Sequence, residues 1–192
     1  MVSVINLLHY KNGAEQPILI LAGLHEPDQS GFDWGALKEV LGNCKATLTS
    51  ARSSGKPVAF VRCIAPPLSV SEPRAYPAWL KGFEPTRNDM VFDMLQPSCY
   101  SNTEFARAME YSNGNFAIAG LFAETACLAT AIDAHHRRHK FTYLSDASAC
   151  RNNGAIPAAL FHNAVSQVVS LYGEVMECQR WNLSLSSNRR TR

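Results

Sequence analysis

The segment GLFAETACLATAIDA, residues 120–134, carries a thiol at a place where a thiol can do chemistry. A small-residue turn at Gly120 leads into a helical pattern, and Cys127 lies in the first turn of that pattern. A helix N-terminus lowers the pKa of a cysteine, and its backbone N–H groups can stabilise an oxyanion. The segment therefore resembles a nucleophile site, with Cys127 either at the nucleophile position or one residue beside it.

Further groups that could take part lie near the ends of other apolar runs. Cys99 is a second candidate thiol, and Glu26 is a candidate proton donor with His25 beside it. The chain has six cysteines and no CxxC pair, which argues against a zinc ribbon or a redox-active dithiol. We expect free thiols, most of them buried as small apolar side chains.

Short apolar runs and helical patterns alternate along the chain. The runs predict strands at 17–23, 57–65, 89–94, 115–121 and 140–147, with a sixth within 173–181. Between them, apolar residues at helical spacing predict helices at 33–55, with Asp33 as cap, at 103–114, with Thr103 as cap, and at 124–138 and 156–172.

This alternation predicts an α/β fold: a three-layer, Rossmann-like parallel sheet of about six strands with helices on both faces. We expect one domain over residues 1–192, with 184–192 as a flexible tail. In such a sheet the site lies at the carboxyl ends of the strands, where the stretches after Gly23, Met94 and Gly120 would meet.

Composition narrows the class of partner. The 192 residues are 46% hydrophobic, with a formal net charge of +2, so charge alone implies no nucleic-acid partner. The first residues have no secretory pattern and no apolar run is long enough to span a membrane, so we expect a cytoplasmic protein.

Several of these segments, taken in order, resemble the isochorismatase-like cysteine hydrolases, which include isochorismatases, nicotinamidases and N-carbamoylsarcosine amidases. The matching pieces are PILILAG, DMVFDMLQPSCYSNTEF, GLFAETACLATAIDA and FTYLSDASA, so the resemblance covers roughly residues 15–176. Members of this family attack a substrate carbonyl with a cysteine thiolate, assisted by an aspartate and a lysine.

Carried over residue by residue, the resemblance places this catalytic triad on three residues that lack its chemistry. The aspartate falls on Ala22, the lysine on Met94 and the cysteine on Ala126, while the threonine three positions before the cysteine falls on Ala123. The resemblance thus implies a hydrolase fold that has lost its catalytic side chains, a pseudoenzyme that binds a small molecule or a partner.

An active hydrolase of a small amide or vinyl ether remains the alternative, using a displaced set such as Cys127 or Cys99 with Glu26. Successive residues of an α-helix differ by about 100° around its axis, so if Ala126 faces the site, Cys127 faces elsewhere, towards the sheet with Ala131 and Ala134. A one-residue bulge would be needed to bring Cys127 back, and the flanking matches need none.

The resemblance also suggests what could surround a ligand. Trp79, Tyr100, Phe122, Ala123 and His25 are candidate binding residues, although ordinary packing is an equal alternative for each aromatic ring. N–H groups of Phe122 and Ala126 could form an anion-binding hole, with a cis peptide before Phe122.

We expect neither metal nor cofactor, because CIAPPLSV, which follows the second strand, lacks the family's metal ligands. The family implies a homo-oligomer. The basic cluster His135–Lys140 contains two histidines four residues apart, which could bind a metal, but it also suits the solvated C-terminus of a helix.

Overall fold

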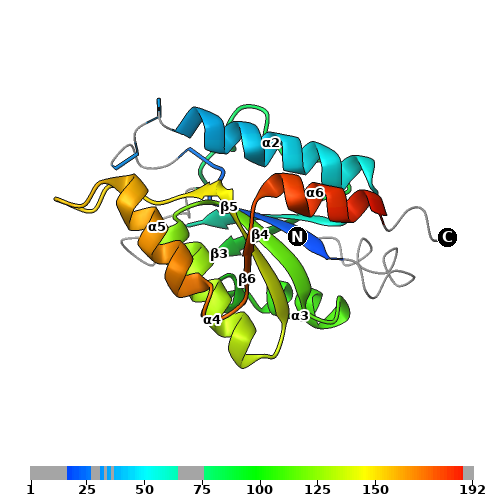
Figure 1. Cartoon of the computed structure of the whole chain (residues 1–192). Helices are drawn as coiled ribbons and strands as arrows, with labels where there is room; N and C mark the ends of the chain where they lie inside the picture. The colour runs from blue at the N-terminus through cyan, green and yellow to red at the C-terminus, as the bar shows by residue number, and fades with distance from the viewer. Residues whose placement is uncertain (1–16, 27–30, 33, 36, 65–75, 188–192) are drawn as a thin grey trace, which may run out of the picture.

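The computed structural model describes residues 17–26, 31–32, 34–35, 37–64 and 76–187. Its strands and helices alternate as expected, in a parallel sheet between two helical layers (Figure 1). The strands are β1 (Ile18–Ala22), β2 (Val58–Cys63), β3 (Met90–Met94), β4 (Asn115–Leu121), β5 (Lys140–Ala149) and β6 (Glu174–Met176). The α-helices are α2 (Leu37–Ser53), α3 (Thr103–Tyr111), α4 (Leu128–His136), α5 (Ala158–Val169) and α6 (Cys178–Ser187), and η1 (Cys99–Ser101) is a short 3₁₀ turn.

The order of the strands fixes where a site can form. The sheet runs β3-β2-β1-β4-β5-β6, and every neighbouring pair is parallel. The chain moves outwards from β1 to β3 and then returns to pair β4 with β1. The order therefore reverses between β1 and β4, and the carboxyl ends of these two strands flank the switch point at which ligands bind in open α/β sheets.

Helices cover both faces of the sheet, and the apolar side chains of β1 pack against both layers. Its five residues are all buried, as continuous apolar runs in parallel sheets require. Because side chains alternate along a strand, Ile18, Ile20 and Ala22 pack with α3, α4 and α5, whereas Leu19 and Leu21 pack on the face covered by α2 and α6.

Gly120 permits a close approach at the switch point. It has φ +132° and pairs with Ala22, and a Cβ built on it would lie 1.9 Å from the Ala22 carbonyl oxygen. Glycine is therefore required at this position. The β4–β5 register shifts beside Gly120, between the pairs Ile118–Tyr143 and Gly120–Ser148.

The resulting bulge in β5 is tied to the helices that cover it. Asn43 on α2 donates to the Asp146 carbonyl oxygen at 2.9 Å, and the Asp146 carboxylate accepts from the backbone N–H of Cys178 at 2.8 Å. Asp146 therefore anchors α2 and the start of α6 to the sheet.

Several local expectations need correction. The cap of α3 is Asn102, whose side chain accepts from Glu104 N–H and Phe105 N–H, and not Thr103. Residues 184–187 belong to α6, where Leu185 is buried, so a flexible tail does not start at 184. The strand expected from the pattern at 173–181 is confined to Glu174–Met176, because the chain from Cys178 onwards forms α6. The proposed cap Asp33 and residues 188–192 lie outside the described residues.

Candidate active site at the carboxyl ends of the strands

The three residues on which the sequence resemblance places a catalytic triad lie on one face of the sheet and share one apolar cluster. Ala22 is the last residue of β1, Met94 is the last residue of β3, and Ala126 lies in the turn that follows β4. Their exposed fractions are 0%, 4% and 0%. All three belong to the hydrophobic cluster between the sheet and the layer of α3, α4 and α5. The fold brings the three positions into one core, but none of them carries a charge or a nucleophile.

The segment that carries Ala126 is not the α-helix that the sequence predicts. Residues Ala123–Cys127 form a π-helical turn, η2, and α4 starts at Leu128. A π-turn accommodates one more residue than an α-turn and often occurs at functional sites. The α-helical angle of about 100° between Ala126 and Cys127 therefore does not hold within η2.

Cys127 nevertheless points into the protein. It is fully buried in the same cluster as Ala131 and Ala134, which the helical pattern placed on its side of the helix. Burial is the main cause that raises the pKa of the Cys127 thiol well above its usual value. At neutral pH the thiol is protonated and inaccessible.

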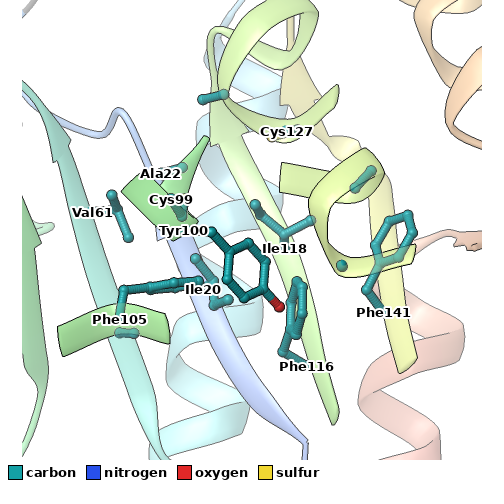
Figure 2. Packing of buried hydrophobic residues seen from close by; sticks show 14 of the residues in the cluster. Ile20, Ala22, Val61, Cys99, Tyr100, Phe105, Phe116, Ile118, Cys127 and Phe141 are labelled. Atoms are coloured by element: carbon teal, nitrogen blue, oxygen red, sulfur yellow. The ribbon is translucent and has the colours of Figure 1, made fainter. Parts of the chain in front are cut away.

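Cys99 has the same character as Cys127. It is fully buried in η1, and burial raises its pKa to about 12. It belongs to the same buried cluster as Ala22 (Figure 2). A thiolate is the nucleophilic form of cysteine, so this pKa disfavours nucleophilic attack at neutral pH.

Four thiols converge in this region, and two of them, Cys63 and Cys150, were not among the candidate residues. Cys63 is the last residue of β2 and Cys150 directly follows β5. Each lies close enough to influence the ionisation of Cys127, as does Cys99. Burial raises the pKa of both Cys63 and Cys150 to about 12. Their places near the ends of two predicted strands could have indicated this, since the carboxyl ends of parallel strands meet at one edge of the sheet.

All six cysteines are free, and the described residues contain no group of three or more His, Cys, Asp or Glu side chains placed to hold a metal ion.

A half-buried ion pair that the sequence did not predict lies at the same edge of the sheet. Glu124 in η2 accepts from Nε of Arg151 at 2.8 Å. The Glu124 side chain is 8% exposed and that of Arg151 is 41% exposed. Oε2 of Glu124 is buried and has no hydrogen-bond partner among the described residues. The two residues are 27 positions apart, so only the folded chain reveals the pair.

His25 and Phe122 form an aromatic group above the end of β1, with ring centroids 6.1 Å apart. The backbone of His25 pairs with that of Trp79 in an isolated antiparallel bridge, but the Trp79 ring packs edge-on against Phe60, with centroids 5.5 Å apart. Arg151 lies over the Phe122 ring, 5.0 Å from its centroid. Two of the five candidate binding residues, His25 and Phe122, therefore have side chains that lie together, and Ala123 follows Phe122 directly along the chain.

His25 is held in a defined orientation. Its Nε2 accepts from the backbone N–H of Cys63 at 3.1 Å, so Nδ1 carries the proton and donates to the Glu26 carbonyl oxygen at 3.3 Å. Burial is the main cause that lowers the pKa of His25. The side chain is therefore neutral at physiological pH. Glu26 itself is exposed.

Tyr100 does not join the aromatic group. Its hydroxyl is hydrogen-bonded to Nδ1 of His139 at 2.6 Å, and its ring packs edge-on against Phe105. His139 directly precedes β5, so the Tyr100 ring extends towards the amino ends of the strands. Figure 2 shows its oxygen beside Phe116, near the start of β4. The candidate binding residues are thus reduced to His25, Trp79, Phe122 and Ala123.

The expected anion-binding hole is not formed. The backbone N–H of Ala126 donates to the Phe122 carbonyl oxygen at 2.7 Å and is therefore occupied. No peptide bond among the described residues is cis, so the peptide before Phe122 is trans. Phe122 instead adopts a left-handed conformation with φ 60°.

The basic cluster does not form a shared site either. Nδ1 of His135 donates to the Tyr172 carbonyl oxygen at 3.2 Å, whereas His139 bonds to Tyr100. Arg137 lies over the Tyr100 ring, 4.8 Å from its centroid. These contacts attach the end of α4 to its neighbours.

Comparison with known proteins identifies the family to which this site belongs. The family model described as the isochorismatase domain matches residues 24–176. The chain belongs to the isochorismatase family. This match includes Met94, η2 and Arg151, and it begins after Ala22. No curated protein shows a significant match.

Solved structures of family members share the fold. An isochorismatase from Pseudomonas putida is 20% identical, with a TM-score of 0.72 over 87% of this chain and 90% of its own. A cysteine hydrolase from Pseudomonas syringae is 18% identical, with a TM-score of 0.75 over 91% and 94%. An isochorismatase-family protein from Chromobacterium violaceum is 16% identical, with a TM-score of 0.79 over 91% and 96%.

At these identities the solved structures show the common α/β architecture. In the part of the chain that the structure describes, no helix is long and apolar enough to cross a membrane.

Proposed function

We propose that this protein is a non-catalytic member of the isochorismatase-like hydrolases, in which the family fold binds a small molecule or a protein partner. One observation carries the proposal: Ala22, Met94 and Ala126 occupy the triad positions together, buried in one apolar cluster. A single replacement would be compatible with a variant mechanism. Three simultaneous replacements by apolar side chains remove the nucleophile, the base and the positive charge.

The surrounding chemistry supports the same conclusion. Hydrolysis through a cysteine requires a thiolate, and every thiol near the triad positions has a pKa raised by burial. The positive charge of Arg151 is engaged with Glu124. The N–H group of Ala126 is occupied by the Phe122 carbonyl oxygen and cannot stabilise an oxyanion as it stands.

Ligand binding at this edge of the sheet would use the aromatic group of His25 and Phe122, whose rings stack above the end of β1. Planar molecules suit such surroundings because aromatic rings stack on them. A small planar ligand is the class that we expect.

The alternative is an active hydrolase of a small amide or vinyl ether that uses Cys127 or Cys99 with Glu26. Against it, both thiols are fully buried and Glu26 is exposed. A substrate carbonyl could reach either sulfur only after the core had opened.

Alkylation of the native protein separates the two functions. Iodoacetamide at neutral pH, followed by mass spectrometry of the intact chain, should give no rapid stoichiometric adduct on Cys127 or Cys99. The denatured protein, as control, should take up one adduct on each of its six cysteines. Rapid modification of one native thiol that disappears in Cys127→Ala or Cys99→Ala, together with hydrolysis of a small amide lost in the same variant, would overturn the proposal.

A further inference from the structure

Two Asn–Gly pairs lie in the part of the chain that the structure describes, Asn113–Gly114 and Asn153–Gly154, and a third, Asn12–Gly13, lies outside it. An Asn–Gly pair is chemically labile because glycine has no side chain to shield its backbone nitrogen. That nitrogen can attack Cγ of the preceding asparagine and close a five-membered ring, a reaction that the proximity of the two groups favours. The fold decides whether a pair can react in this way, and it treats the two described pairs differently.

The pair Asn113–Gly114 is locked into the end of α3. Asn113 is left-handed, with φ 54°, and its N–H donates to the Glu110 carbonyl oxygen at 3.2 Å. The N–H of Gly114 donates to the Met109 carbonyl oxygen at 2.8 Å. Together these two bonds form a Schellman motif, a common hydrogen-bonded end of an α-helix. Gly114 is also buried, so its nitrogen can act as a nucleophile only after the end of α3 has opened.

The pair Asn153–Gly154 lies in an exposed turn between β5 and α5. The N–H of Ile156 donates to the Asn153 carbonyl oxygen at 3.0 Å, which closes a four-residue turn. Gly154 occupies its first central position with φ +56°, and nothing apart from its chain neighbours lies within 4 Å of a Cβ built on it. Among the described residues the N–H of Gly154 has no hydrogen-bond acceptor. All four residues of the turn are exposed, so the Gly154 nitrogen and the Asn153 carboxamide are both open to water.

We propose that Asn153 is a site of spontaneous modification, at which asparagine is converted to aspartate and isoaspartate. The Gly154 nitrogen loses its proton to hydroxide and forms a bond to Cγ of Asn153. The bond from Cγ to the side-chain nitrogen breaks, and this nitrogen takes a proton from water and leaves as ammonia. Water then opens the resulting succinimide: attack at the side-chain carbonyl gives aspartate, and attack at the backbone carbonyl gives isoaspartate. The proposal is independent of the proposed function, because the reaction requires neither activity nor a ligand.

The two products should differ in their effect on the start of α5. The side chain of Asn152 accepts from the Ala158 N–H at 3.2 Å, and the Asn152 N–H donates to the Gly31 carbonyl oxygen at 2.9 Å. Isoaspartate carries the chain through its side-chain carbon, which adds one atom to the backbone of the turn between Asn152 and Ala158. Aspartate keeps the backbone unchanged and adds only a negative charge. The isoaspartate form should therefore loosen the start of α5, whereas the aspartate form should not.

Peptide mapping by mass spectrometry tests the proposal. The native wild-type protein is incubated in mildly alkaline buffer, sampled over time and digested, and the conversion of amide to acid is followed at each asparagine. Asn153 should be modified at least about tenfold faster than Asn113, because Gly114 must first break its hydrogen bond. Enzymatic methylation of the free α-carboxylate should detect isoaspartate at position 153.

The unfolded chain is the control for local sequence. In concentrated guanidinium chloride both pairs lose their folded surroundings, so their rates of modification should become similar. Asn153→Gln should remove the fast modification, because a longer side chain would have to close a six-membered ring, and it should leave the rate at Asn113 unchanged. Equal rates at the two positions in the native protein would overturn the proposal. A difference that persists in guanidinium chloride would overturn it too, because local sequence would then be its cause.

Urea unfolding tests the effect on α5. The isoaspartate form is enriched by chromatography, and the variant Asn153→Asp supplies the aspartate form with an intact backbone. The isoaspartate form should unfold at a lower urea concentration than the wild type, whereas Asn153→Asp should unfold at nearly the same concentration. Equal midpoints for the isoaspartate form and the wild type would contradict the role of this turn in holding the start of α5, and so would an equal loss in both modified forms.

Discussion

At the scale of single residues, the candidate site combines an apolar floor with one ion pair. In the proposed function, Ala22, Met94 and Ala126 take the places of the family's reacting side chains, and all three are buried. Apolar replacement of a buried charge cluster is often neutral or stabilising, because the charges no longer have to be desolvated. Glu124 and Arg151 remain charged at the same edge of the sheet. We infer that their role is structural, holding η2 against the segment that follows β5.

Arg151→Ala should therefore destabilise the protein more than the loss of an ordinary surface ion pair. It leaves the Glu124 carboxylate 8% exposed and without its cation. Because Arg151 is itself partly exposed, we expect a loss of about 2 kcal/mol, below the range for fully buried pairs. The control Arg107→Ala breaks the exposed pair with Glu104 and should cost at most about 0.5 kcal/mol.

Urea unfolding at neutral pH measures both losses. Glu124→Gln combined with Arg151→Ala should recover part of the stability, because it removes the unpaired buried charge. Equal effects of Arg151→Ala and Arg107→Ala would show that the Glu124–Arg151 pair does not stabilise η2.

At the scale of elements, the junction of β1, β4 and η2 depends on backbone conformation. Gly120 lets β4 approach the carbonyl oxygen of Ala22, and Gly23, with φ +72°, leaves room for the Phe122 ring. Phe122 itself is left-handed, a conformation that costs a non-glycine residue of order 1–3 kcal/mol. The surrounding contacts of Phe122 with His25, Phe32 and Arg151 hold it there.

Substitution of Gly120 tests this junction. Gly120→Ala should lower stability by more than about 4 kcal/mol or prevent folding, because its Cβ would overlap the Ala22 carbonyl. Gly42→Ala is the matched control: nothing lies within 4 Å of a Cβ there, on the exposed side of α2. It should raise stability by about 0.5–1 kcal/mol. Thermal unfolding followed by circular dichroism compares the two, and an unchanged midpoint for Gly120→Ala would contradict the close approach.

The elements also show how far the sequence could predict the structure. Continuous apolar runs predicted β1 to β5 because strands buried on both faces need them at every position. Helical spacing predicted α2 to α5 for a similar reason. The π-turn η2 was missed because its extra residue depends on how Phe122 and Ala123 pack against the sheet. The bulge in β5 depends on a distant glycine, and the Glu124–Arg151 pair joins residues from two elements. Local sequence patterns contain none of this information.

At the scale of the whole molecule, the fold buries most of its cysteines in the core. Five of the six are buried, and Cys63 is half-buried. They occupy both layers, with Cys127 on the α4 side and Cys44 on the α2 side. Burial is the largest cause of the raised pKa of every one of them. The native protein therefore holds thiol protons that the unfolded chain releases at lower pH.

This difference predicts that the protein loses stability in alkaline solution. Unfolded thiols ionise near pH 8.5, whereas Cys63, Cys99, Cys150 and Cys178 stay protonated to about pH 12. Between these two pH values the native state binds more protons than the unfolded state. The contribution of these thiols to the free energy of unfolding is therefore fully present below about pH 8.5 and falls as pH rises. The loss is up to about 1.4 kcal/mol per pH unit for each thiol. Urea unfolding under reducing conditions at several pH values above neutrality measures the slope. Cys99→Ala should make the dependence of the free energy of unfolding on pH less steep, because one buried thiol is removed. A free energy of unfolding that stays constant up to about pH 10 would contradict the burial of these groups.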